Sequence, residues 1–168
     1  MTIDVSSILK ELGGKIDVAG EVNVSDIEFN GEKYTFDAPL KVKGVVSNNG
    51  KALVLTADVE AEMGTQCARC LDDIIVDAGF SIEESFVQSD ENSEKDEDII
   101  YFDGYTIDID DVVESNLIMN IKGKYLCDDD CLGLCPQCGQ NLNDGECDCN
   151  KEFIDPRWAG LADLMKND

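Results

Sequence analysis

The sequence predicts an α+β fold, in which an antiparallel β-sheet or meander with flanking helices holds a cysteine-rich tail through zinc. Three features predict this fold. Residues 40–84 alternate between apolar and polar side chains, an Asn-Gly pair interrupts the alternation, and eight cysteines form four close pairs. Hydrophobic residues make up 43% of the 168 residues, which is enough to build a folded core.

The first forty residues carry weaker signals. Residues 6–12 predict a short helix that ends at Gly13 and Gly14, and β-like pieces stand at residues 22–24 and 34–36. The first ten residues lack a basic segment followed by an apolar stretch, so they do not resemble a secretory signal. No window approaches the roughly 20 apolar residues of a membrane helix, and we expect a cytoplasmic protein without a membrane partner.

Residues 40–84 predict the antiparallel meander. Leu40, Val42 and Val46 lead to a turn at residues 47–50, whose Asn-Gly pair tolerates positive φ and favours a hairpin. The next strand has an apolar face made of Leu53, Leu55, Ala57, Val59, Ala61 and Met63. A second strand with the same period follows, and its apolar face is made of Ile74, Val76, Ala78, Phe80 and Ile82.

A helix is expected near residues 110–120. Asp108 or Asp110 can cap its N-terminus, because a carboxylate accepts hydrogen bonds from the free N–H groups of the first turn. Val113 and Leu117 lie four residues apart and therefore share one face. We expect this face to pack in the core.

The chain is expected to divide into a β-rich domain at residues 1–122 and a cysteine-rich zinc-binding tail at residues 123–168. An acidic loop at residues 88–98 belongs to the first part and favours either a solvated segment or a contact for a basic partner. A helix should end the tail, with Asp155 as N-cap and Pro156 in its first turn. Its apolar stripe would consist of Ile154, Trp158, Leu161 and Met165.

The cysteines are the candidate zinc ligands. They form the pairs Cys67 and Cys70, Cys127 and Cys131, Cys135 and Cys138, and Cys147 and Cys149. A reducing cytoplasm disfavours disulfides, and two such pairs supply the four thiolates of a closed structural zinc site. The surrounding tail is rich in Gly, Asn and Asp and has little to bury, so bound metal would have to supply its stability.

The order of the cysteines favours two zinc ions over one. The last four are close enough in sequence to form a local site, and the first four would then join the tail to the sheet. The alternative is a single ion held by some other set of four. Thiol–disulfide redox chemistry at Cys67 and Cys70 is a further hypothesis, although residues 71–80 predict a strand and a redox CxxC opens a helix.

The formal net charge of −24 and the absence of histidine narrow the function. Histidine is the commonest general base, so its absence argues against an enzyme. The negative charge repels nucleic-acid backbones and suits a basic protein partner. Residues 126–150 contain six acids and no lysine, arginine or aromatic residue, which leaves Lys41, Lys43 and Arg69 as candidates for a weak RNA contact.

Parts of the cysteine-rich sequence resemble the YceD family. The resemblance rests on Cys67-Ala-Arg-Cys70-Leu71, on Cys131-Leu-Gly-Leu-Cys135-Pro-Gln-Cys138-Gly-Gln-Asn-Leu-Asn143, and on Cys147-Asp-Cys149 followed by Asp155-Pro156-Arg157. It runs from about residue 40 to the end of the chain. Besides the cysteines, its matching positions are Arg69, Gly133, Gly139, Asn141 and Asn143.

Members of this family are called large ribosomal RNA subunit accumulation proteins. The resemblance implies a bacterial cytoplasmic protein that is needed for normal large-subunit rRNA levels and has no known catalytic activity. Some members keep the first CxxC but lack the full C-terminal cluster, so the second zinc site is expected to serve stability in this branch.

We therefore expect a non-enzymatic ribosome-biogenesis factor. Its acidic surface would bind a basic ribosomal protein or a ribosomal precursor particle and act on rRNA indirectly. Direct rRNA binding through Lys41, Lys43 and Arg69 is the first alternative, and a CxxC redox protein is the second.

Overall fold

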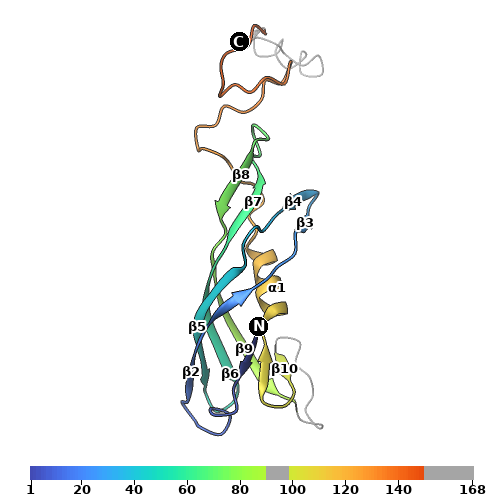
Figure 1. The fold of residues 1–168 in the computed structure, drawn as a ribbon. Helices are drawn as coiled ribbons and strands as arrows, with labels where there is room; N and C mark the ends of the chain where they lie inside the picture. The colour runs from blue at the N-terminus through green and yellow to red at the C-terminus, as the bar shows by residue number, and fades with distance from the viewer. Residues whose placement is uncertain (90–98, 150–168) are drawn as a thin grey trace, which may run out of the picture.

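The computed structural model describes residues 1–89 and 99–149, which form an elongated molecule with a sheet at one end and the cysteine-rich tail at the other (Figure 1). The main sheet has five strands in the order β10 (Ile100–Phe102), β9 (Phe80–Gln88), β6 (Leu53–Glu60), β5 (Leu40–Asn48) and β2 (Lys15–Val22). Neighbouring strands in it are antiparallel except β9 and β10, which are parallel. The predicted α+β class is confirmed.

One large apolar core lies between this sheet and α1 (Asp110–Asn120), which runs alongside it (Figure 1). Strand β6 alternates as predicted, with Leu55 fully buried and Thr56 exposed. The helix contributes Val113 and Leu117, which are 0% and 1% exposed. The predicted helix and its packed face are confirmed.

The start of α1 differs from the prediction. Ile109 occupies the N-cap, and no side chain caps the helix. Asp108 still accepts the N–H of Asp110 through Oδ1 at 3.1 Å, and the amino group of Met1 forms ion pairs with both carboxylates. The N–H of Asp110 and the charge of Met1 hold the pKa of Asp108 below its ordinary value.

The turn between β5 and β6 confirms the predicted hairpin. The N–H of Asn49 donates to the carbonyl of Ala52 at 3.1 Å, and Oδ1 of Asn48 accepts the N–H of Gly50 at 2.8 Å. Gly50 has a φ of +87°, whereas Asn49 keeps a negative φ. The turn thus uses the conformational freedom of the glycine alone.

The predicted long strand through Met63 is divided. After Ala61 the chain leaves the main sheet as β7 (Glu62–Gln66), which pairs with β8 (Asp73–Asp77) to form a hairpin arm (Figure 1). The second predicted strand is also divided, into β8 and β9. The break lies opposite Ala61, whose carbonyl accepts the N–H of Ala78 at 2.9 Å. The arm therefore extends the apolar alternation beyond the sheet.

The expected helix at residues 6–12 is wrong. The segment forms isolated turns, in which the N–H groups of Ile8 and Leu9 both donate to the carbonyl of Val5. Nδ2 of Asn48 donates hydrogen bonds to the carbonyls of Ile8 and Leu9, at 2.7 and 3.1 Å. Those carbonyls are the acceptors that a continuing helix would need.

Three short pairings complete the N-terminal part. β1 (Thr2–Asp4) pairs with β11 (Thr106–Asp108), and β3 (Ile27–Phe29) pairs with β4 (Glu32–Tyr34). Thr35 is joined to Gly64 by two backbone hydrogen bonds of 2.9 and 2.8 Å, so that β4 lies against β7. The β-like pieces expected at residues 22–24 and 34–36 are only partly in strands, because β2 and β4 end at their first residues.

A second, smaller core lies beneath the arm. Tyr34, Met63 and Tyr125 are all at least nine-tenths buried there. The rings of Tyr34 and Tyr125 meet edge to face, with centroids 6.5 Å apart and planes at 71°. This core fixes the point at which the chain after α1 turns along the arm.

Some predictions lie outside the described residues. These are the acidic loop beyond residue 89 and the C-terminal helix with Asp155, Pro156 and its apolar stripe. The division at residue 122 stays a prediction. Among the residues described, no helix is long and apolar enough to cross a membrane.

Replacing Leu55 with alanine should lower the free energy of unfolding by about 2–5 kcal/mol, because the side chain is fully buried. Thr56→Ala, at the exposed neighbouring position, should change it by less than about 0.5 kcal/mol. Urea unfolding followed by circular dichroism measures both. Equal losses in the two variants would contradict the burial of one face only.

Candidate metal centre

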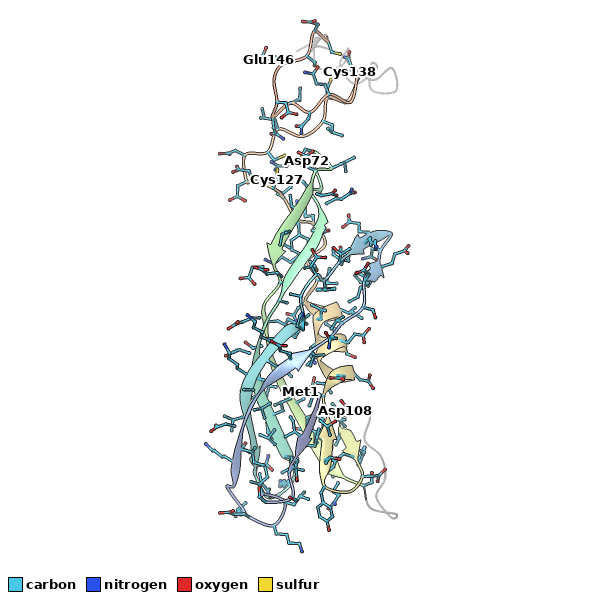
Figure 2. The ribbon with its side chains drawn as sticks, in the orientation of Figure 1. Met1, Asp72, Asp108, Cys127, Cys138 and Glu146 are labelled. Carbon is cyan, nitrogen blue, oxygen red and sulfur yellow. The ribbon has the colours of Figure 1, made fainter. Side chains whose placement is uncertain are left out.

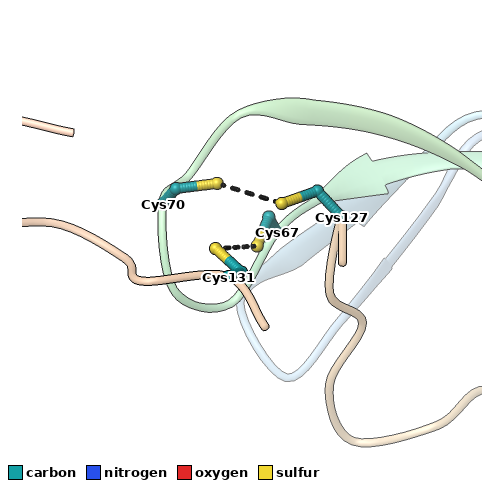
Figure 3. A group of neighbouring side chains, drawn as sticks. All are labelled: Cys67, Cys70, Cys127 and Cys131. Atoms are coloured by element: carbon teal, nitrogen blue, oxygen red, sulfur yellow. Dashed lines mark hydrogen bonds between the residues drawn. The ribbon is translucent and has the colours of Figure 1, made fainter. Parts of the chain in front are cut away.

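The first four cysteines meet at the tip of the hairpin arm (Figure 3). Cys67 and Cys70 lie on the turn between β7 and β8, and Cys127 and Cys131 come from the segment after α1. The sulfur atoms of Cys67 and Cys131 are 3.8 Å apart, and those of Cys70 and Cys127 are 3.6 Å apart. All four sulfur atoms lie within 4.8 Å of one another.

Backbone hydrogen bonds fix the turn that presents Cys67 and Cys70. The N–H of Leu71 donates to the carbonyl of Cys67, and the N–H of Cys67 donates to the carbonyl of Asp72, both at 2.9 Å. Leu71 has a φ of +63°, a conformation that costs a non-glycine residue about 1 kcal/mol. Its side chain is 57% exposed. The turn thus aims two sulfur atoms the same way at a local cost in strain.

The second group lies beyond the tip of the arm, where Figure 2 labels Cys138. It consists of Cys135, Cys138, Cys147 and Cys149, whose sulfur atoms also lie within 4.8 Å of one another. Its CxxC turn repeats the first, because Gly139 donates to the carbonyl of Cys135 at 2.9 Å and Cys135 donates to that of Gln140 at 2.8 Å. Here a glycine, Gly139, takes the positive φ of +74°.

The tail is fastened to the first turn by hydrogen bonds to its own main chain. The N–H of Ala68 donates to the carbonyl of Tyr125 at 2.8 Å. Nη1 of Arg69 donates to the carbonyls of Asp129 and Cys131, at 3.0 and 2.8 Å. The guanidinium therefore holds the loop between Cys127 and Cys131 in place.

Gly133 allows the tail to pass close to this turn. The N–H of the next residue, Leu134, donates to the carbonyl of Arg69 at 3.1 Å. Gly133 has a φ of +74°, and a Cβ at this position would lie 3.0 Å from the carbonyl oxygen of Arg69. Both the conformation and the close approach favour glycine.

Two asparagines connect the cysteine groups. Nδ2 of Asn143 donates to the sulfur of Cys131 at 3.3 Å, and its Oδ1 accepts the N–H of Leu132 at 2.7 Å. Nδ2 of Asn141 donates to Asp72 at 3.0 Å, and Oδ1 of Asn141 accepts the N–H of Asn143 at 3.0 Å. In the sequence, Asn141 and Asn143 stand out only as positions that match the family resemblance, and their contacts with the arm were not predicted. Their place between two cysteine pairs is the signal for such contacts.

The thiols in each group do not share one environment. Burial raises the pKa of the Cys67 thiol, but the backbone N–H groups of Cys70, Arg69 and Cys127 outweigh burial and lower it to about 6. The N–H groups of Cys138 and Gln137 lower the pKa of Cys135 to about 6. In both turns the N–H groups therefore stabilise the thiolate of the first cysteine, and a thiolate is the form that ligates metal.

The donor set fits a tetrahedral metal ion. A tetrahedron with Zn–S bonds of about 2.3 Å has edges of about 3.8 Å, close to the two S–S distances in the first group. Cys67, Cys70 and Cys131 are buried, and no histidine or carboxylate is needed to complete the four. Each group can hold one metal ion, and the partition predicted from the sequence is the one in which the structure groups the sulfur atoms.

Comparisons with known proteins identify the family. The family model described as "Large ribosomal RNA subunit accumulation protein YceD" matches residues 55–165. This match includes all eight cysteines. The chain belongs to the YceD family.

Individual relatives of this YceD-family protein are distant. An uncharacterised protein of Mycobacterium tuberculosis is 29% identical over 98% of this chain and 81% of its own length. The uncharacterised protein YlbN of Bacillus subtilis is 27% identical over 78% of this chain and 77% of its own. A chloroplastic homologue in Arabidopsis thaliana, "Large ribosomal RNA subunit accumulation protein YCED homolog 1", is 35% identical over 36% of this chain and 19% of its own. No solved structure matches.

The candidate RNA-binding cations of this YceD-family protein lie apart from one another. Lys41 and Lys43 share the exposed face of β5, as predicted, whereas Arg69 lies on the arm. Nζ of Lys43 is 3.1 Å from Glu60, and Lys41 has Glu21 and Glu60 as its cross-strand neighbours. Each cation therefore already has an anionic or carbonyl neighbour.

Gly133→Ala should loosen the contact between tail and arm, because the new Cβ would press on the carbonyl of Arg69. The amide of Leu134 should then exchange its hydrogen at least about tenfold faster, as measured by NMR. Gly139→Ala is the matched control, since it has the same φ of +74° but an open surrounding. Unchanged exchange of Leu134 in Gly133→Ala would contradict this role.

Proposed function

We propose that this YceD-family protein is a non-enzymatic ribosome-biogenesis factor of the cytoplasm, which supports accumulation of large-subunit rRNA by binding a basic ribosomal protein. The observation that carries the proposal is the uncompensated negative charge. The chain has 37 acids against 13 lysines and arginines, and it belongs to a family named for the accumulation of this RNA. Such a surface attracts basic proteins at long range.

The arrangement of the charges supports this partner. Lys33 and Lys43 form ion pairs with Asp26 and Glu60, at 2.8 and 3.1 Å. Arg69 donates to main-chain carbonyls. These three cations already have partners within the chain, and many acids are left facing solvent. Free ribosomal proteins carry the opposite charge, because they are built to bind phosphate.

We propose that each cysteine group holds a structural zinc ion. Four thiolates select zinc or an iron–sulfur cluster, and a closed tetrahedron offers no open position for catalysis. Each zinc with four thiolates adds a charge of −2, so two would take the formal −24 to about −28. The ions would thus order the tail and deepen its negative potential.

The redox alternative has little support from the arrangement of its cysteines. Cys67 and Cys70 lie on a hairpin tip between two strands, and not at the N-terminus of a helix. Cys127 and Cys131 stand beside them in the same group. A pair surrounded by two further thiols suits metal binding better than disulfide exchange.

Protein purified under reducing conditions should contain about two zinc ions per chain, as native mass spectrometry would measure. Replacing Cys67 and Cys70 with serine should remove one ion, and replacing Cys135 and Cys138 should remove the other. One ion in the unaltered protein would support the single-site alternative. None would contradict structural zinc.

The tagged protein should retrieve a basic large-subunit protein from its host, and the complex should survive RNase and weaken with salt. Lys41→Glu combined with Lys43→Glu tests the RNA alternative in the same experiment, because only direct RNA binding requires those cations. The adaptor proposal predicts that the double variant binds as well as the unaltered protein. Retrieval of rRNA together with every protein, lost with RNase and with the variant, would overturn it.

A further inference from the structure

A groove of about 560 Å³ opens between β4 and β7. Its closed end is the Thr35–Gly64 bridge, where two backbone hydrogen bonds join the strands. Beyond the bridge the β3–β4 hairpin turns away from the arm, so the strands separate (Figure 1). Lys33, Gln66 and Leu71 are among the residues that line the opening.

Beyond the Thr35–Gly64 bridge, each wall of this groove presents a strand edge that pairs with no other strand among the described residues. On its other side, β7 pairs with β8. There the carbonyl of Ala61 accepts the N–H of Ala78, and the N–H of Cys67 donates to the carbonyl of Asp72. The main chain of Gly64 points the opposite way, toward the groove, and bonds to Thr35. Because hydrogen-bonding directions alternate along a strand, the N–H and C=O of Gln66 face the groove. The same alternation turns the main chain of Lys33 toward it from β4.

One buried side chain in the groove wall has an unsatisfied hydroxyl group. Thr65 lines the groove and is 6% exposed, and its Oγ1 has no hydrogen-bond partner within the part of the chain that the structure describes. Buried hydroxyl groups are normally hydrogen-bonded. Thr65 is thus an unsatisfied group beside the groove, and its enclosed Oγ1 is not itself a contact for an incoming chain.

The charge of the groove selects the occupant. Glu32 and Asp73 line it. Asp72 precedes Asp73 at the tip of the arm, where its carboxylate accepts a hydrogen bond from Asn141. The lysine in the lining, Lys33, forms an ion pair with Asp26 at 2.8 Å. The exposed side chain of Leu71 stands at the rim and offers apolar contact.

We propose that this β4–β7 groove binds an extended basic segment of a protein partner, which adds as a strand along β7. The inference rests on the proposed function for the class of partner. Main-chain hydrogen bonds to Gln66 would supply affinity, and acids on the walls would select lysine and arginine side chains. Leu71 would contact an apolar side chain between them.

The first test uses a fluorescein-labelled peptide of alternating arginine and valine and the full chain with its metal. Fluorescence anisotropy should detect binding, and Gln66→Pro should weaken it roughly tenfold because proline removes an N–H that faces the groove. Ile75→Pro is the matched control, since the N–H of this exposed β8 residue faces the opposite edge of the same hairpin. Equal weakening by both variants would overturn the proposal.

A charge variant keeps the test valid if proline disturbs the arm. Glu32→Lys with Asp73→Lys should weaken peptide binding roughly tenfold. Asp17→Lys with Glu83→Lys makes the same change in net charge at exposed positions of the main sheet and should leave most of the binding. Equal weakening by the two double variants would show that binding depends on net charge alone, and it would contradict binding in the groove.

Amide exchange measured by NMR locates the peptide directly. The amides of Gln66 and Lys33 should become protected when the peptide binds, and protection of Ile75 instead would place the strand on the wrong edge. If the groove variants retrieve the basic ribosomal protein as well as the unaltered chain, the groove is overturned and the proposed function stands. If the unaltered chain binds the peptide at Gln66 but retrieves no ribosomal protein, the proposed function fails and the groove stands.

Discussion

The contact between Cys67 and Cys70 on the arm and Cys127 and Cys131 on the tail is the constraint on which the far half of the molecule depends. The main sheet and α1 bury a large apolar core of their own. Residues 126–149 have few apolar side chains, and the order of this described segment comes from backbone hydrogen bonds around the sulfur atoms. The metal ion that we propose there would replace the hydrophobic core as the source of stability.

The same constraint positions the surfaces that we assign to binding. The arm projects from the sheet as two strands, a form that is marginally stable alone. Its tip contacts the tail and its base packs with Tyr34 and Tyr125, and the groove lies between β7 of this arm and β4. Asp73 lines this groove. The zinc sites would thus serve recognition through geometry, without taking part in chemistry.

Much of this arrangement could be predicted where apolar residues or cysteines recur at a regular spacing in the sequence. The alternation around Leu55 and the helical spacing of Val113 and Leu117 identified β6 and α1, because burial imposes those periods. The pairing of the cysteines gave the two groups, since spacing decides which thiols can share an ion. The helix predicted at residues 6–12 does not form, because the side chain of Asn48, about forty residues away, donates hydrogen bonds to carbonyls that a helix would use. The groove and the roles of Asn141 and Asn143 depend on tertiary contacts and leave no periodic signal.

We propose that apolar burial folds the sheet whereas bound metal orders the arm tip and tail. Hydrogen exchange of single amides, measured with bound metal and after chelation under reducing conditions, tests it most directly. The amides of Ala68 and Leu134, which donate across the contact between arm and tail, should lose protection without metal, while amides in β5, β6 and β9 should keep theirs. Unchanged protection of Ala68 and Leu134 after chelation, or loss of protection throughout the sheet, would contradict it.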